Sequence, residues 1–173
     1  MDPIPSAERC LELLHESGCS EKVINHCCAV RDVAVRIAKK ANANVPLVEA
    51  GALLHDIGRS TTHGVMHAVE GVKIARRYGL PLDIMYIIER HLGAGIPQDE
   101  AIQLGLPPKD YLPETLEEKI VAHADNLIHG TVQQPIEVEI REAQDKGLPQ
   151  VAKRLRDLHK YLSDRCGIDI NDI

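Results

Sequence analysis

Residues 45–60 read VPLVEAGALLHDIGRS, and this stretch decides the fold. Glu49 is its only charged residue before position 56, so a helix formed here must be buried on nearly all sides. Pro46 suits the first turn of a helix, and Gly58 suits the position just after the last residue. We therefore expect a buried helix from 46 to about 57 with other helices packed around it.

Helical periodicity continues on both sides, and no segment alternates apolar and polar residues persistently enough to require a strand. Ser6 and Ser20 suit N-caps, and Thr115 with Glu118 forms a capping box. The predicted fold class is therefore all-α, a bundle of about seven to eight helices. The expected helices cover residues 6–17, 20–41, 46–57, 65–78, 81–92, 115–129, 135–146 and 149–165. Between them, residues 94–113 are expected to form a long ordered loop with one helical turn at 99–104, and such loops are often functional.

Composition limits the classes of function. The 173 residues fit a single domain spanning 1–173, and 44% hydrophobic with 27% charged residues is typical of a globular protein. The chain has no Phe or Trp and a net charge of −6, so we expect no extended nucleic-acid surface. A small phosphorylated substrate held by a metal is compatible with this charge, because a bound cation reverses the local field.

The five cysteines include no C-x-x-C pair, and Cys27 and Cys28 are adjacent. This pattern favours small buried thiols in a reducing cytoplasm over a disulfide framework or a structural zinc site. The start of the chain, Met-Asp-Pro-Ile-Pro, lacks the features of a signal peptide, and no apolar run reaches the length of a membrane span. We expect a cytoplasmic protein; the sequence leaves its oligomeric state open.

The residues that carry chemistry begin with His55 and Asp56, at the end of the buried helix. A buried carboxylate is costly unless positive charge accompanies it. Arg59 can supply that charge as an ion pair, and a bound metal is the alternative.

More imidazole and carboxylate groups fall on inward faces when the expected helices are drawn. His26 aligns with Val30 and Ile37, and Asp125 lies four residues after Val121. Singly, each is also typical of a core histidine or a capping carboxylate. One shared metal centre accounts for the whole set, and these ligand types suit iron, manganese, cobalt, nickel or zinc. The candidate ligands, on five helices, are His26, His55, Asp56, His67, His91 and Asp125.

Two further histidines are left outside the candidate ligands. His123 shares a helical face with Lys119 and Asn126, so we expect it to be solvated or to support a ligand from outside. His63 forms an H-x-x-x-H spacing with His67, but residues 61–64 read as a loop.

The order His26, His55-Asp56 and Asp125 resembles the H…HD…D signature of the HD superfamily, and residues 55–58 resemble its HDIG variant. The resemblance covers about residues 20–129 and implies an HD-domain-like helical bundle, with 135–165 as a C-terminal helical extension. His67 in HAVEG and His91 in RHLG resemble the two additional histidines of H…HD…H…H…D members. Those members hold two metals, bridged by the aspartate of the HD pair.

This resemblance implies a metal-dependent phosphohydrolase or phosphodiesterase that acts on a small phosphorylated substrate, expected to be a nucleotide. His26, His55, Asp56 and Asp125 would hold one divalent transition metal, and His67 and His91 would hold a second with Asp56 shared. A metal-activated hydroxide would then attack the phosphate. The expected catalytic residues are Asp56 and Arg59. Many family members carry a Lys at the position of Arg59, which either contacts the phosphate or pairs with a neighbouring carboxylate.

Three alternatives stay open at this point. The first is a mixed-valent di-iron oxygenase, since some HD members use a similar ligand set. The second is a mononuclear nucleoside monophosphatase in which His67 and His91 contact only substrate. The third is a non-catalytic regulatory module that binds metal or nucleotide.

Overall fold

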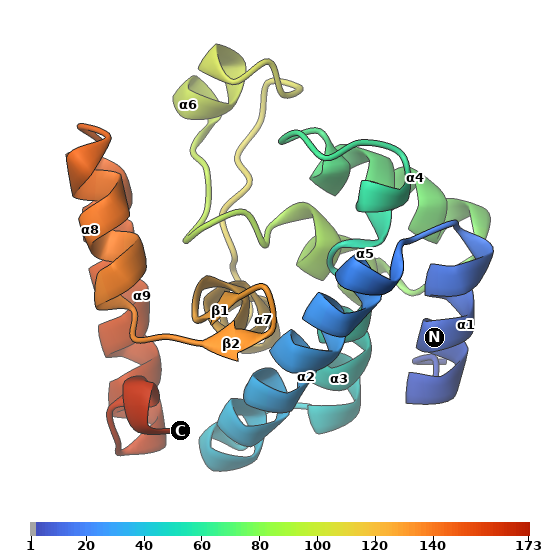
Figure 1. Cartoon of the computed structure of the whole chain (residues 1–173), viewed down its shortest axis with the longest axis horizontal. Coiled ribbons are helices and arrows are strands. Elements are labelled where there is room, and N and C mark those ends of the chain that lie inside the picture. Colours follow the sequence, from blue (N-terminus) through green and yellow to red (C-terminus); the bar gives the residue numbers. More distant parts are fainter. Residues whose placement is uncertain (1–2) are drawn as a thin grey trace.

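A computed structural model describes residues 3–173 and consists of helices joined by loops, with one small β-hairpin (Figure 1). The prediction of an all-α fold is confirmed. The α-helices are α1 (Ala7–Glu16), α2 (Glu21–Ala41), α3 (Val45–Leu54), α4 (His67–Arg77), α5 (Leu82–Glu89), α6 (Gln98–Gln103), α7 (Leu116–Asn126), α8 (Glu137–Asp145) and α9 (Pro149–Cys166). Two 3-10 turns, η1 (Ile57–Ser60) and η2 (Ile170–Asp172), and the strands β1 (Ile128–His129) and β2 (Val132–Gln133) complete the described chain.

Helix α3 forms the centre of the bundle, as its sequence predicts. It packs against α1, α2, α5 and α7, and its residues Leu53 and Leu54 are fully buried. Asn44 caps its first turn by accepting a hydrogen bond from the Leu47 backbone N–H. Because four helices pack around α3, the side chains of His55 and Asp56 that follow its carboxyl end are buried.

The carboxyl end of α3 differs from the prediction. The α-helix stops at Leu54 rather than near 57, and Asp56 leaves helical geometry with φ −99° and ψ 14° before η1 begins. A Cβ atom on Gly58 would lie 1.8 Å from the His67 carbonyl oxygen, so the backbone of α4 passes directly against this turn. The close crossing turns the chain just after His55, where a side chain on residue 58 would block it.

The end of α7 also differs. Helix α7 stops at Asn126, and Ile128–His129 pairs antiparallel with Val132–Gln133 around Gly130, which has φ +64°. The left-handed conformation of Gly130 lets the chain reverse here instead of continuing the expected helix to 129. The turn of this hairpin lies against α2, where its backbone contacts His26.

The segment 94–113 is an ordered loop that contains α6, as predicted. Its strand-like bridge between Ile96 and Tyr111 closes a small apolar cluster with Ala101 and Leu106. Figure 1 shows α6 standing apart from the central helices. The loop is therefore held in place by a small apolar cluster that is separate from the main core.

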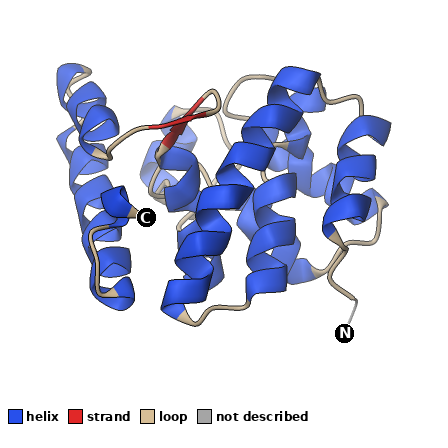
Figure 2. Cartoon of the chain, turned by 60° about the horizontal axis from the view of Figure 1, so that its bottom comes forward, coloured by secondary structure: helices blue, strands red, loops and turns tan. Residues whose placement is uncertain are grey.

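The C-terminal helices form a separate layer on one side of the bundle. Helices α8 and α9 pack against each other, and α9 also contacts α2 and α7. The two ends of the described chain lie on opposite sides of the molecule (Figure 2). Within residues 3–173, none of the helices has the length and apolar character needed to cross a membrane.

Candidate metal centre

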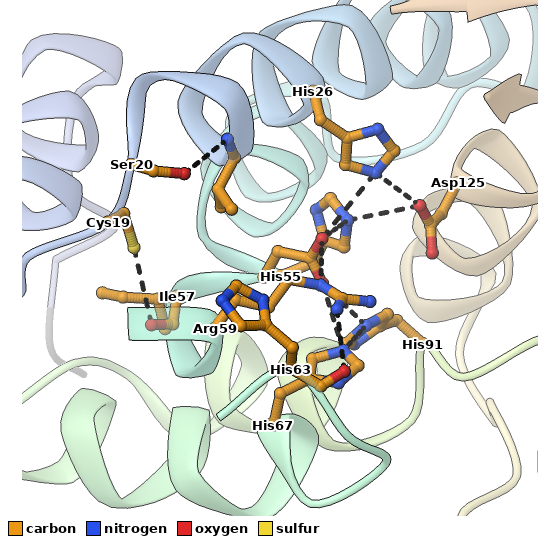
Figure 3. A network of polar contacts seen from close by, with 12 residues as sticks. Cys19, Ser20, His26, His55, Ile57, Arg59, His63, His67, His91 and Asp125 are labelled. Carbon is orange, nitrogen blue, oxygen red and sulfur yellow. Dashed lines mark hydrogen bonds and ion pairs between the residues drawn. The ribbon is translucent and has the colours of Figure 1, made fainter. Parts of the chain in front are cut away.

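The six side chains singled out from the sequence converge in one place. Figure 3 labels the four histidines and Asp125. They come from well-separated parts of the chain: α2, the turn after α3, the start of α4, the segment that follows α5, and α7. Their ligand atoms form two groups, each within 4.8 Å of one another. One group is His26, His55 and Asp125, and the other is Asp56, His67 and His91.

Asp56 belongs to the second group but also approaches the first, because its two oxygens face different histidines. Asp56 Oδ1 lies 3.1 Å from His67 Nε2 and 3.3 Å from His91 Nε2. Asp56 Oδ2 lies 3.6 Å from His55 Nε2 and 3.7 Å from His26 Nε2. One carboxylate is thus placed to contribute to both groups.

The rings of the four candidate ligand histidines, His26, His55, His67 and His91, are all oriented by a hydrogen bond to a backbone carbonyl. Each Nδ1 lies 2.6 to 2.8 Å from a backbone carbonyl oxygen, which can only accept, so Nδ1 carries the proton. In the neutral ring Nε2 is then a free lone pair, and it points into the site. Metal-binding histidines are commonly fixed by such a hydrogen bond from the other ring nitrogen. The four carbonyls belong to Gly130, Ala52, Gly64 and Ile88.

The donor atoms of the site fit a bound cation. His55 Nε2 and Asp56 Oδ1 are buried and have no hydrogen-bond partner among residues 3–173. His67 Nε2 and His91 Nε2 face each other at 3.0 Å, although both Nδ1 protons are already used elsewhere. A bound cation would give the buried atoms a partner and would remove the repulsion between the two Nε2 lone pairs. Imidazole with carboxylate is a donor set that divalent transition metals prefer.

The electrostatics keep the carboxylates ionised. Burial opposes ionisation of Asp56, but His55, His67 and His91 outweigh it and hold the pKa of Asp56 well below its usual range. Burial is likewise overcome at Asp125, whose pKa is lowered by His55 and His26. At His91, burial lowers the pKa and favours the neutral ring. At His55, burial lowers the pKa, but Asp56 and Asp125 outweigh it and raise the pKa well above its usual value, which favours the charged ring. Because ionised carboxylates and neutral imidazoles are the forms that bind metals, a metal at this site would displace a proton from His55.

Arg59 forms the ion pair that the sequence left as one possibility. Its Nε lies 2.9 Å from Asp56 Oδ2, and its Nη1 donates to the His63 carbonyl oxygen at 3.1 Å. The side chain is only partly buried, so the guanidinium lies at the edge of the candidate centre, toward solvent.

The structure corrects the interpretation of His123. Its side chain is fully buried rather than solvated, and its Nε2 lies 2.8 Å from Nδ1 of His159 on α9. Burial lowers the pKa of His123 to about 3. The face of α7 that was expected to be solvent-exposed is covered by α9. The periodicity of α7 alone does not reveal this contact.

Two residues outside the predicted set also lie near the centre. Cys27, expected from the sequence to be a small buried thiol, is buried, and its thiol lies within ligand range of His55 and Asp56. Its position next to His26 in the chain was the available signal. His63 is exposed and lines a pocket that also reaches His26 and Asp56.

Fold and site together define a class of helical proteins that gather buried histidine and aspartate side chains at a candidate metal centre. The sequence profile of the HD domain matches residues 23–129, and the chain belongs to this family.

Several curated relatives resemble the chain. It is 53% identical over 140 residues to the uncharacterized protein MJ0778 of Methanocaldococcus jannaschii, covering 78% of this chain and 82% of that protein. It is 49% identical over 170 residues to the tRNA (cytidine(56)-2'-O)-methyltransferase of Thermoplasma volcanium, covering 98% of this chain. The chain spans about half the length of that methyltransferase. A shorter match, 38% over 82 residues, joins 46% of this chain to 16% of Ribonuclease Y of Thermobifida fusca.

A solved structure shares the fold. The HD domain of the L. monocytogenes phosphodiesterase PgpH, in complex with cyclic-di-AMP, matches with a TM-score of 0.57 at 18% identity. The match covers 87% of this chain and 92% of that domain.

Proposed function

We propose that this chain is a metal-dependent phosphohydrolase that cleaves a phosphodiester bond in a small nucleotide substrate. The observation that carries the proposal is the position of Asp56, whose two oxygens each face one of the two His/Asp groups. A carboxylate in this position suits a pair of metals that share it as a ligand.

The site residues divide into two sets in this proposal. His26, His55 and Asp125 hold one divalent transition metal, His67 and His91 hold a second, and Asp56 contributes to both. When bound, two such metals lower the pKa of water and compensate charge on the phosphoryl oxygens.

The remaining work falls to the chain itself. The backbone carbonyls that hold Nδ1 of the histidines keep each Nε2 aimed at the site before substrate arrives. Arg59, on the solvent side of Asp56, is placed to turn toward a phosphate with two N–H donors. Burial of Asp56 among other side chains excludes bulk water from one side of the reacting phosphate.

The choice of a nucleotide phosphodiester draws support from the relatives. Ribonuclease Y is named for cleavage of RNA, and the PgpH domain is a phosphodiesterase with a cyclic dinucleotide bound. Both names describe phosphodiester chemistry on nucleotides, in proteins that share part of this sequence or its fold.

The methyltransferase name has a different explanation in this proposal. The matched region is about half of the T. volcanium protein, so methyl transfer is assigned to the other half. Histidine and aspartate ligands around metals suit activation of water, not transfer of a methyl group. Incubating this chain with labelled S-adenosylmethionine and tRNA should transfer no label; transfer by this chain alone would contradict the assignment.

Hydrolysis of bis(p-nitrophenyl) phosphate tests the proposal directly. Chelator-treated protein should be inactive, and adding back manganese, cobalt, nickel, zinc or iron should restore hydrolysis with at least one metal. Asp56→Ala should abolish it, while the exposed control Asp32→Asn, whose carboxylate pairs with Arg31 and with no other residue among 3–173, should not. Oxygen consumption without phosphoester cleavage would favour the di-iron oxygenase. Metal or nucleotide binding without turnover of either kind would favour a regulatory module.

A further inference from the structure

We infer that the pocket above the candidate metal centre binds a second phosphate group of the substrate through Lys22 and His63. The preferred substrates would then carry two phosphate groups about one nucleoside apart. This inference rests on the proposed function, because it takes the first phosphate to lie at the metals.

The pocket connects the centre with solvent. It has a volume of about 300 Å³, and its lining includes His26 and Asp56 at the buried end and Lys22 and His63 at the exposed end. Arg59 lies between them and contacts both Asp56 and the backbone of His63 (Figure 3). The volume is at the lower limit for ligand pockets, so it accommodates about one nucleotide unit.

The charge of this pocket is opposite to that of the whole chain. The protein carries a net charge of −6, yet the pocket lining has two basic side chains, Lys22 and Arg59, against the single carboxylate of Asp56. Arg59 already pairs with Asp56. Lys22 makes no ion pair with any described residue and is therefore the uncompensated charge of the pocket.

The position of Lys22 on its helix adds to this argument. Lys22 lies in the first turn of the 21-residue helix α2, where the helix dipole is positive and a cation is unfavourable for the helix. Its acidic neighbour Glu21 approaches His15 at 3.7 Å and does not line the pocket. The partial positive charge of the helix N-terminus and the Lys22 ammonium group thus add together on one wall of the pocket, which favours binding of an anion.

His63 supplies a second donor to the same pocket. Its side chain is exposed and makes no hydrogen bond or ion pair within residues 3–173, and it stands beside Arg59 at the pocket entrance (Figure 3). An imidazole in either protonation state offers at least one N–H to a phosphate oxygen. Lys22 and His63 together therefore form a phosphate-binding pair that is separate from the six candidate metal ligands.

Two probes that differ only in the second phosphate test this inference. They are the dinucleotides pApA and ApA, each with a phosphorothioate linkage that slows cleavage, and their dissociation constants are measured by calorimetry. The metal-loaded wild-type chain should bind pApA at least about tenfold more tightly than ApA, because charge-assisted hydrogen bonds to one phosphate distinguish them. The double variant Lys22→Gln, His63→Gln should reduce this ratio to about one and leave the affinity for ApA unchanged.

Lys39→Gln is the matched control, since Lys39 is an exposed lysine in the last turn of the same helix. It should keep the wild-type ratio. Equal affinities of the wild type for both probes, or a preference that survives the double variant, would overturn the inference. The readout is binding, so it decides this point even if bis(p-nitrophenyl) phosphate is not hydrolysed, a result that would contradict only the proposed function.

Discussion

Replacing Asp56 with Asn separates a shared ligand from one that belongs to a single metal. The substitution keeps the shape of the side chain but removes its charge and one oxygen acceptor. Asp56 Oδ1 faces His67 and His91, while Oδ2 faces His26 and His55. We therefore expect the substitution to lower the affinity for both metals. His91→Gln removes a ligand from one group only and should affect one metal.

The size of the difference follows from simple occupancy. Loss of even a supporting partner typically weakens metal binding 10- to 100-fold, so we take about 100-fold for a ligand. With free metal at about ten times the native dissociation constant, each native site is about 90% filled and each weakened site about 10%. Doubly loaded protein should therefore fall from about 80% to about 1% in Asp56→Asn, but only to about 10% in His91→Gln.

Elemental analysis of protein equilibrated with buffered metal measures these occupancies. The wild type should hold nearly two metals per chain, His91→Gln about one, and Asp56→Asn well below one. The exposed variant Asp32→Asn should match the wild type. If Asp56→Asn keeps one fully occupied site, or if His91→Gln loses both metals, the assignment of Asp56 as the shared ligand is wrong.

Three further predictions concern the frame around the site. Glu118→Gln removes the buried carboxylate charge that pairs with the partly buried Arg90 at 3.0 Å. Calorimetry should register a loss of about 2 kcal/mol and 4 to 8 °C in melting temperature; no change would mean that water already screens the pair. His123 is neutral when folded, with its pKa lowered to about 3, so its contribution to stability is intact above pH 6.5 and declines as the pH falls toward 3. Between pH 7.5 and pH 5, the free energy of unfolding measured by denaturant titration should fall by about 2 kcal/mol less in His123→Gln than in the wild type. An equal fall in both proteins would refute this. Gly58→Ala forces a methyl group against the His67 carbonyl, so the free energy of unfolding should fall by at least about 2 kcal/mol and one bound metal should be lost. A variant with the melting temperature and metal content of the wild type would refute this.

The helical architecture and the gathering of six polar side chains were both predictable from local patterns. Burial of the 45–54 helix follows from its single charged residue, Glu49, and the inward direction of His26 and Asp125 follows from their spacing to apolar neighbours. These inferences succeed because the helical period fixes the direction of a side chain before any tertiary contact forms. The metal-binding roles of these residues stay a prediction, which the occupancy experiments address.

The errors arise where tertiary contacts override local patterns. Periodicity shows which face of a helix is apolar, but not that a later helix covers the polar face, and His123 was misread for that reason. The end of the helix before Asp56 depends on the approach of the α4 backbone to Gly58, a contact between chain segments that no local rule supplies. The hairpin after Asn126 is too short for an alternating pattern to be visible.

Three of the four histidine rings are oriented by the carbonyl three residues earlier in their own chain segment: Ala52 for His55, Gly64 for His67 and Ile88 for His91. Each of these ligands thus carries its own orienting group within a single turn of backbone. Correct aim then requires only that three short turns be brought together, and not a network of mutually dependent side chains. Such modularity would let the surrounding loops change their substrate contacts over evolution while the ligand rings keep their directions.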